Sequence, residues 1–419
     1  MDLTSEEQAI LAGDRGAVLA KVLRTVVAFG ELMGAEQLVP VVGGAHTAVG
    51  CALKTHEPYH GFLDELLGAG LKIEPYFTAD PLAVDTANID YSPEELAHIT
   101  ATLREAENTE RYLALGLKDR NAFTCTCYFE EVGNRPSRGD VLAWSESSAV
   151  SYANSVLGAR CNRNAIGMEM LCGIIGKVPC FGLLLDRNRK AHCLLQLETD
   201  GLPSPHLLGS LIGKRLVEDI PFIAGLDRLT DGKDPRDVSD YLKDMGAAAA
   251  AAGAVALYHV ENVTPEARAA GRTLLRDGFR TTTVTDADIS ALHKSFPVVW
   301  PDPTAQPETC IIGCPHLSQR QTTRWVRTIA AQLKAKNRQK VGVQTILCTA
   351  PDTARLVRAD AQIMDLCAEH DIRISHICGL AHMLNPVTAA RPIITDSAKL
   401  QYYTSARFYT EDALLEQIT

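Results

Sequence analysis

Cysteine side chains fall beside three of the short apolar runs that we predict to be strands. Cys125 and Cys127 lie in the first run, Cys314 follows the second and Cys378 follows the third. Three thiolates from separate strand ends suit an iron–sulfur cluster with an open iron position, because an incomplete shell leaves room for substrate. No paired C-x-x-C occurs, so a closed zinc site has little support. Core packing is the alternative for any of the twelve cysteines, since cysteine is among the most buried residue types.

Other reactive side chains lie at the ends of further predicted strands. His46 follows two glycines, and an imidazole titrates near neutral pH, as proton transfer requires. Asp80 follows another strand, and Lys399 begins a helix, where a cation is unfavourable unless it serves a ligand. Each has an ordinary alternative: His46 and His316 could cap strand ends, Asp80 could satisfy loop donors, and Lys399 could be solvated.

Small polar residues begin a helix that we predict at residues 147–157. Glu146, Ser147 and Ser148 lie where free N–H groups and the positive end of the helix dipole would accept an anion. Further donors to a carboxylate follow them: Asn154, Arg160 and Arg163. Ordinary helix capping by Ser147 or Ser148 explains the same pattern.

The elements that must position these residues alternate between short apolar runs and helical patterns. Strands are predicted at 254–260, 281–284, 309–313, 341–348, 372–377 and 392–395, with helices at 265–275, 288–296, 319–336, 351–370 and from 397. This alternation predicts an α/β fold of mostly parallel sheets flanked by helices. Ligands of such sheets bind beyond the carboxyl ends of the strands, where the reactive residues gather.

The first half of the chain shows a looser version of this pattern. Helices are predicted at 16–33, 61–67, 93–116 and 147–157, and strands at 38–42, 71–77 and 122–129. Gly201, Pro203 and Pro205 mark a break within 199–206. We therefore expect an N-terminal α/β region at 1–205 and a C-terminal one at 206–419, in two or three subdomains.

Composition excludes several classes of function. The formal charge of −10 argues against a surface that binds nucleic acid through general positive charge. No run of about 18 apolar residues is present, and the acidic start lacks the basic head of a secretory signal. Neither a G-x-G-x-x-G nor a phosphate-cradling loop occurs. We expect a cytoplasmic protein that contacts neither membrane nor nucleic acid.

The sequence resembles the aconitase X family, the catalytic or large-subunit type of the aconitase superfamily. The long motif around Glu146 is the most specific part of the match, and shorter motifs extend it in order over most of the chain. The matching pieces are Gly44-Ala45-His46, Thr124-Cys125, Glu146 to Val150, Ala153 to Arg160, Gly313 to His316 and Ser397-Ala398-Lys399.

This resemblance implies an aconitase-like fold, an iron or iron–sulfur centre held by three cysteines, and dehydration of a small hydroxy acid. The cysteines that match are Cys125, Cys314 and Cys378. The remaining expected roles are substrate binding by Asp80, Ser147, Ser148, Asn154 and Arg160, and a catalytic wall of His46, Ser397 and Lys399. The other cysteines expected in the core are Cys51, Cys161, Cys172, Cys180, Cys193, Cys348 and Cys367.

The sequence departs from the family pattern at three places. Cys127 replaces a proline and could compete as an iron ligand, and Asp80 replaces an asparagine. The swivelling domain, whose loop is thought to supply a catalytic serine, has no evident counterpart. A separate small subunit is therefore an expected partner, unless this branch uses a base of its own.

Two substrates follow from the family, and a rival class stands beside them. The acidic Asp80 favours an amine-bearing substrate, so we expect cis-3-hydroxy-L-proline, with mevalonate 5-phosphate as the alternative. A phosphate would need extra cations near Arg160, Arg163 and Lys399. The rival is a non-catalytic aconitase-like iron-binding protein.

Overall fold

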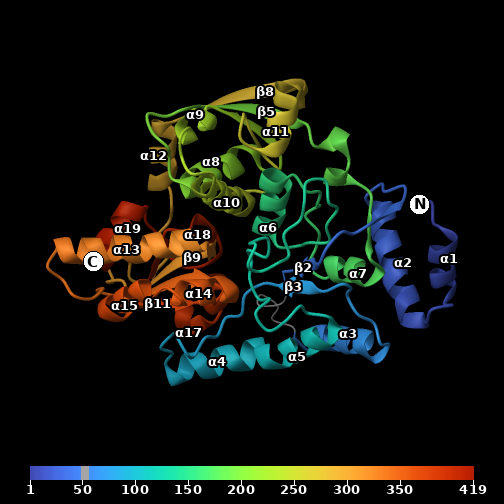
Figure 1. Cartoon of the computed structure of the whole chain (residues 1–419), viewed down its shortest axis with the longest axis horizontal. Coiled ribbons are helices and arrows are strands. Elements are labelled where there is room, and N and C mark those ends of the chain that lie inside the picture. The colour runs from blue at the N-terminus through green and yellow to red at the C-terminus, as the bar shows by residue number, and fades with distance from the viewer. Residues whose placement is uncertain (49–55) are drawn as a thin grey trace.

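The computed structural model of the chain describes residues 1–48 and 56–419. Cys51, expected in the core, lies outside the described residues. The chain forms three lobes around a shared centre: residues 1–190, 191–294 and 295–419. Figure 1 shows the first lobe in blue to green, the second in green to yellow at the top, and the third in orange to red at the left.

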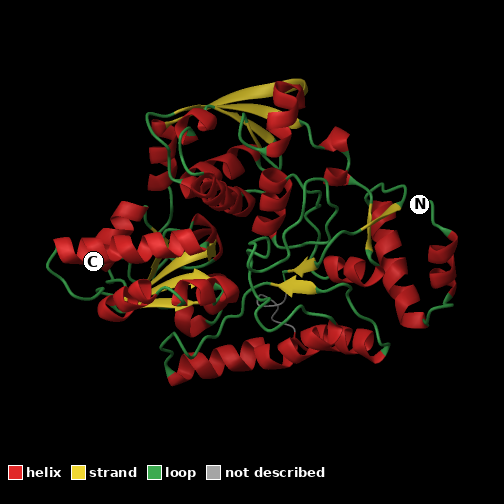
Figure 2. Cartoon of the chain, viewed as in Figure 1, coloured by secondary structure: helices red, strands yellow, loops and turns green. Residues whose placement is uncertain are grey.

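The third lobe contains a five-stranded parallel sheet in the order β11-β10-β9-β12-β13. Its strands are β9 (Thr309–Leu317), β10 (Gln344–Thr349), β11 (Ile372–Ser375), β12 (Ile393–Thr395) and β13 (Arg407–Phe408). Its helices, which surround the sheet in Figure 2, are α13 (Gln319–Ala335), α14 (Pro351–Arg358), α15 (Ala361–His370), α16 (Gly379–His382), α17 (Pro386–Ala389), α18 (Ala398–Tyr403) and α19 (Glu411–Ile418). The predicted α/β class with parallel sheets is confirmed here.

The second lobe contains a four-stranded parallel sheet in the order β7-β6-β5-β8. Its strands are β5 (Ala191–Glu198), β6 (Pro221–Ala224), β7 (His259–Val260) and β8 (Leu275–Thr285). Its helices are α8 (Pro205–Leu216), α9 (Leu226–Thr230), α10 (Pro235–Ala252), α11 (Pro265–Ala270) and α12 (Asp286–Lys294). Because β5 pairs with β6 and β8, the break that we predicted within 199–206 falls inside this lobe.

Close approach of α8 and α10 explains the alanine run of the second lobe. A Cβ on Gly209 would lie 2.1 Å from the Met245 carbonyl oxygen, and one on Gly213 would lie 2.6 Å from that of Ala249. Small residues on both helices are therefore required where they cross. Residues 247–252 form the end of α10.

The first lobe is mostly helical, with two small pairs of strands. β2 (Ala45–Thr47) and β3 (Phe77–Ala79) pair in parallel, and β1 (Leu38–Pro40) pairs antiparallel with β4 (Lys177–Pro179). The helices are α1 (Ser5–Ala12), α2 (Ala17–Leu32), α3 (His56–Gly68), α4 (Pro93–Leu103), α5 (Glu105–Leu115), α6 (Ser147–Tyr152) and α7 (Met168–Ile175). A single π-helical turn, Ala153–Leu157, follows α6.

Three predictions for the first lobe are wrong. The strand expected at 71–77 is irregular up to Tyr76, and β3 begins only at Phe77. The strand expected at 122–129 is an irregular segment whose ladder pairing is one bridge, between Phe123 and Ala79. There the Thr124 hydroxyl accepts a hydrogen bond from the Thr126 backbone N–H, a local bond that competes with strand pairing. The helix expected at 93–116 is α4 and α5, which separate at Arg104 with a left-handed φ of 48°.

A buried carboxyl group in the first lobe predicts a pH-dependent stability. Glu169 is fully buried on α7, and Thr47 donates a hydrogen bond to one of its carboxylate oxygens. Burial raises the pKa of Glu169 from 4.5 to about 7, so the folded chain keeps this proton at a pH where the unfolded chain releases it. Its contribution to the free energy of unfolding is greatest below about pH 4.5 and falls as pH rises through 7.

Replacement of Glu169 by glutamine removes this titration. We expect E169Q to be more stable than the wild type at pH 8, by up to about 3 kcal/mol, with a much smaller difference at pH 4.5. Denaturant unfolding at the two pH values measures the effect. E36Q, at an exposed glutamate, is the control. The prediction is contradicted if the free energies of unfolding of E169Q and the wild type differ by the same amount at both pH values.

Candidate active site at the junction of the three lobes

An ion pair between the first and third lobes lies at the centre of the site. Lys399, in the first turn of α18, donates from Nζ to Glu146 Oε1 at 2.5 Å. Glu146 caps α6, since its other oxygen accepts from the Ala149 N–H and the Ser148 hydroxyl, both at 2.6 Å. Burial would favour a neutral Glu146, but Lys399 outweighs it and lowers the pKa to about 2. Burial likewise opposes the charge on Lys399, yet Glu146 raises its pKa well above the ordinary value.

The three predicted metal ligands lie around this pair. Cys314 is on β9, Cys378 precedes α16, and Cys125 is in the irregular segment of the first lobe. Burial raises the pKa of Cys314 to about 12 and that of Cys125 well above its ordinary value, while the charge of Lys399 opposes both shifts. The thiol of Cys378 also acts electrostatically on Cys314. Sulfurs far apart in the sequence thus share one environment.

The spacing of these side chains bears on the kind of metal centre. Within residues 1–48 and 56–419, no three His, Cys, Asp or Glu side chains are arranged to hold a single ion. Sulfurs that bind a cluster contact different irons, so they need not converge on one point. Cys125 is buried, Cys314 and Cys378 are half-buried, and the three come from separate chain segments.

A second polar pair consists of His46 on β2 and Asp80 beyond β3. His46 Nε2 lies 3.6 Å from Asp80 Oδ1, and the His46 Nδ1 is 2.9 Å from the Thr78 hydroxyl. Among the described residues, neither His46 Nε2 nor Asp80 Oδ1 has a hydrogen-bond partner, although both are buried. These two atoms therefore face each other as an ion pair and make no hydrogen bond to other described residues.

The electrostatics of the pair follow from burial and from neighbouring acids. Burial raises the pKa of Asp80, and the nearby Glu146 carboxylate adds to the increase. Burial of the His46 ring opposes protonation, but Cys127 and Asp80 outweigh it and raise the pKa of His46. The arrangement holds a proton between an imidazole and a carboxyl group.

Ser397, which we predicted as catalytic, has a structural use for its hydroxyl. It donates to the Cys314 carbonyl and accepts from the Leu400 N–H as the N-cap of α18. Ser147 is half-buried at the first position of α6, and Ser148 bonds Glu146. The anion site expected at this helix start is filled by the carboxylate of Glu146 itself.

Three predicted donors are not brought to the cluster. Asn154 donates to the carbonyls of Cys161 and Ala256 at 2.8 and 3.0 Å, while its oxygen accepts from the Cys161 N–H and from Arg189. Arg160 bonds the Leu184 carbonyl and Asp186, and Arg163 is exposed. Asn154 thus makes all four hydrogen bonds that an asparagine can make. For these separate reasons, Asn154, Arg160 and Arg163 are not part of the proposed site.

The structure adds residues that the sequence did not single out. Asn134 donates to the Thr78 hydroxyl at 2.9 Å and so fixes the group that orients His46. Trp144 packs edge-on against the His46 ring, with centroids 5.8 Å apart. Neither residue carries a sequence signal for these roles, because an isolated asparagine or tryptophan is common in loops and cores.

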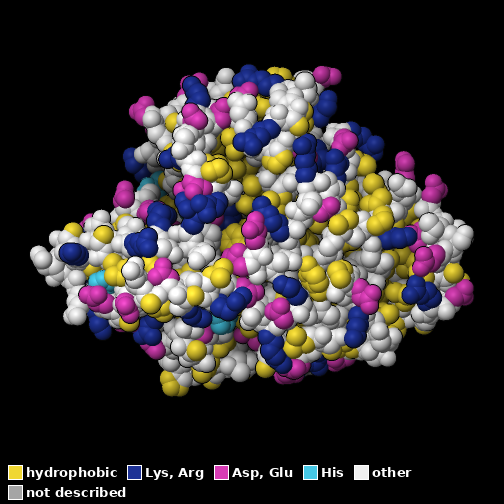
Figure 3. Space-filling view, in the orientation of Figure 1, with side chains coloured by type: hydrophobic (Ala, Val, Ile, Leu, Met, Phe, Trp, Pro, Cys, Tyr) yellow, Lys and Arg dark blue, Asp and Glu magenta, His cyan; other side chains and the backbone are white. Residues whose placement is uncertain are grey.

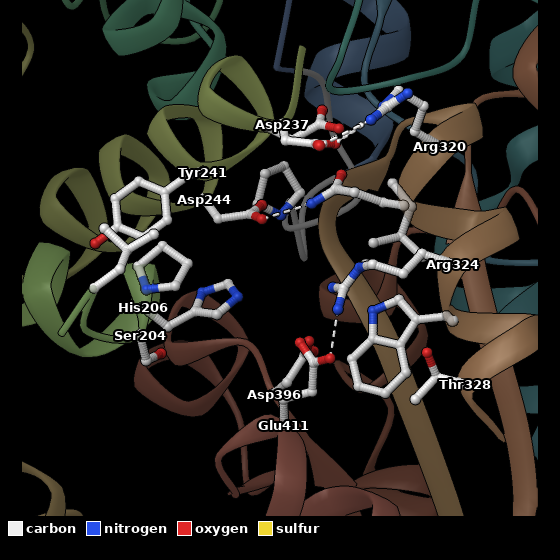
Figure 4. A pocket seen from close by; sticks show the side chains of 18 of the residues that line it. Ser204, His206, Asp237, Tyr241, Asp244, Arg320, Arg324, Thr328, Asp396 and Glu411 are labelled. Carbon is white, nitrogen blue, oxygen red and sulfur yellow. Dashed lines mark hydrogen bonds and ion pairs between the residues drawn. The ribbon is translucent and has the colours of Figure 1, made fainter. Parts of the chain in front are cut away.

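A cavity of about 960 Å³ borders the cluster between the second and third lobes (Figure 4). Cys314 lines it, whereas His46, Asp80, Glu146 and Lys399 do not. Arg320 forms an ion pair across the two lobes with Asp237 at 2.8 Å, and Arg324 pairs with Glu411 within the third lobe. Asp396 also lines it, and burial raises the pKa of Asp396 to about 7. The cavity therefore adjoins the candidate active site but is not lined by its acid, base and lysine side chains.

Comparison with known families assigns the chain. The family model described as "Aconitase X first domain" matches residues 1–187, and "Aconitase X second domain" matches residues 191–294. The chain belongs to the aconitase X family. A solved structure, "Crystal structure of Thermococcus kodakaraensis aconitase X (holo-form)", superimposes with a TM-score of 0.82 at 31% identity and covers 100% of both chains. The fold expected from the sequence is confirmed.

Relatives with names are dehydratases of two kinds. The "Phosphomevalonate dehydratase large subunit" of Thermococcus kodakarensis is 35% identical over 345 residues, which cover 81% of this chain and 78% of the relative. The "Cis-3-hydroxy-L-proline dehydratase" of Pseudomonas aeruginosa is 32% identical over 298 residues, which cover 66% of this chain and 48% of the relative. Aconitase X is thus a family of hydro-lyases, and this chain is a member of that enzyme class.

The surface agrees with the sequence on two points. Acidic and basic side chains are interspersed over the face shown in Figure 3. Among the described residues, no helix combines the length and the apolar character that a bilayer crossing requires.

Proposed function

We propose that this aconitase X chain removes water from a small hydroxy acid, cis-3-hydroxy-L-proline, with the help of an iron centre. The observation that carries the proposal is the pair of buried, unpartnered atoms His46 Nε2 and Asp80 Oδ1. They lie in the electrostatic neighbourhood of the Lys399–Glu146 ion pair, which is itself coupled to Cys125 and Cys314. An acid–base pair, a fixed cation and thiols at one place are what an elimination of water requires.

The cofactor would be held by Cys125, Cys314 and Cys378. An iron centre bound there would supply a Lewis acid for the departing hydroxyl group. Because burial raises the pKa of the Cys125 and Cys314 thiols, both are protonated at neutral pH without metal, and binding would release those protons.

The protein side chains would bind the substrate and move its proton. Glu146 and Ser148 occupy two of the three N–H donors of Lys399, which leaves one for a substrate carboxylate. His46, oriented by Thr78 and held protonated beside Asp80, would give a proton to the departing hydroxyl group. The serine of the proposed partner subunit would take the proton from the carbon beside the carboxylate. Ser147 adds a half-buried hydroxyl beside the same pair.

The charge of the site favours an amino acid over a phosphorylated substrate. Glu146 already neutralises Lys399, and Arg160 is paired with Asp186 away from the cluster. A phosphate would find no spare cation among these residues, whereas Asp80 suits the ammonium group of cis-3-hydroxy-L-proline. The second candidate is mevalonate 5-phosphate, which the 35% identity to a phosphomevalonate dehydratase large subunit favours.

A separate small subunit is part of the proposal. Relatives of this chain from Thermococcus kodakarensis and Methanocaldococcus jannaschii are named as large subunits. We propose that a partner carrying the swivelling domain closes the site and supplies a catalytic serine.

Assay of the anaerobically purified chain tests the function. The chain is prepared with and without a co-expressed small-subunit homologue, and each preparation is incubated with either substrate. Loss of one water from cis-3-hydroxy-L-proline, followed by mass spectrometry, supports the proposal. Turnover of mevalonate 5-phosphate alone selects the second candidate, and bound iron without turnover of either supports a non-catalytic iron-binding protein.

Asp80 provides a specific prediction about substrate charge. Asp80→Asn keeps the size of the side chain but removes its charge, so kcat/KM for cis-3-hydroxy-L-proline should fall about 10- to 100-fold. The same change should leave kcat/KM for a phosphorylated substrate equal or higher. Asp186→Asn, at the exposed partner of Arg160, is the control. An equal fall for both substrates would assign Asp80 to chemistry and not to recognition.

A further inference from the structure

The polar groups of His316 contact three other segments of the chain. It lies on β9 and is 1% exposed. Its backbone N–H donates to Cys125 Sγ at 3.3 Å, and its carbonyl accepts from Lys243 Nζ at 3.0 Å. Cys125 is in the first lobe, Lys243 is in the second and His316 itself is in the third. The two backbone groups of His316 therefore connect all three lobes.

The imidazole adds two further contacts. Nε2 is 3.0 Å from the Ile377 carbonyl, and Nδ1 is 2.9 Å from the Thr124 hydroxyl. A carbonyl can only accept, so Nε2 carries the proton of this bond. Both ring nitrogens are therefore bonded to protein, which excludes His316 as an iron ligand or as the proton carrier of the reaction in this arrangement.

These contacts reach the immediate neighbours of all three cysteines. Thr124 precedes Cys125, Ile377 precedes Cys378, and His316 follows Cys314 by two residues. The segment around Cys125 has little support from strand pairing, and Cys378 lies beyond the end of β11. Through its ring, this single side chain links the segments of Cys125 and Cys378 to β9.

We propose that His316 is a positioning residue that fixes the relative placement of Cys125, Cys314 and Cys378 and so controls how tightly the iron centre is retained. The proposal rests on the proposed function, in which these cysteines are the ligands. Lys243 supports the same junction from the second lobe: it is fully buried, pairs with Asp244 at 2.8 Å, and holds the His316 carbonyl.

The test measures the rate at which iron leaves the anaerobic holoprotein for an excess of a coloured iron chelator. His316→Phe removes both ring contacts, and we expect iron loss at least about tenfold faster than in the wild type, with an altered electron paramagnetic resonance spectrum. His316→Gln can keep the donor toward Ile377, so an intermediate rate is expected. His259→Phe is the matched control, because His259 is also buried and bonds a carbonyl, that of Arg189 at 2.8 Å.

A second variant keeps the test decisive if His316→Phe does not fold. Thr124→Val preserves shape, removes only the hydroxyl that bonds Nδ1, and should accelerate iron loss in the same direction. Wild-type rates and spectra in both His316→Gln and Thr124→Val overturn the proposal. A wild-type chain that binds no iron at all would instead overturn the proposed function, so the two failures are distinguishable.

Discussion

Lys399→Met is expected to abolish turnover, with a fall of at least about 1,000-fold in kcat, and to destabilise the fold. The substitution leaves Glu146 as a buried carboxylate without its counterion, which typically costs about 3–5 kcal/mol. It also removes the N–H that we assign to the substrate carboxylate. Turnover and denaturant unfolding of the purified chain measure the two effects.

A double variant separates stability from catalysis. Lys399→Met with Glu146→Gln removes both charges, so most of the stability should return while turnover stays lost. Lys177→Met is the control, since Lys177 pairs with the buried Glu7 at 2.6 Å outside the cluster. Recovery of turnover in the double variant would show that the ion pair is structural only.

Loss of iron is the second large effect that we expect. Cys314→Ala and Cys378→Ala should each reduce bound iron and sulfide to near background and eliminate turnover, because a thiolate ligand is removed in each case. Iron and sulfide analysis after anaerobic purification measures this directly. Cys348→Ala is the matched control, since Cys348 is buried on β10 and acts electrostatically with both Cys314 and Cys378.

The same iron analysis distinguishes Cys125 from Cys127 as the ligand in the first lobe. Cys125→Ala should lose iron, whereas Cys127→Ala should retain it, because Cys127 interacts with His46 in the structure. The reverse result would assign the ligand to Cys127. Iron that stays bound after both Cys314→Ala and Cys378→Ala would remove these two residues from the ligand set.

Sequence patterns were most informative where strands are buried on both faces. β9, β10 and β11 are largely apolar segments, and a continuous apolar segment of this length predicts a strand buried on both faces. The run at 122–129 has a similar composition, yet its threonines bond their own backbone and prevent a strand. β5 was missed because polar residues such as His192 and Gln196 interrupt its apolar run.

The candidate site was partly predictable for a topological reason. His46 and Asp80 meet because β2 and β3 are paired parallel strands, with His46 in one strand and Asp80 directly after the other. Cys314 lies within β9 of a separate sheet. Contacts between lobes carry no such rule. The pairing of Glu146 with Lys399 joins residues 253 positions apart, and the partners that occupy Asn154 lie on separate loops. Side-chain chemistry alone could not show that Asn154 is committed elsewhere.

The ion pair between Glu146 and Lys399 also has a consequence for how the protein is made. A ribosome adding about 5–20 residues per second needs roughly 10–50 s to proceed from one residue to the other. During that interval the nascent first lobe carries an acid whose counterion has not yet been synthesised. The active arrangement can therefore form only after translation has passed α18.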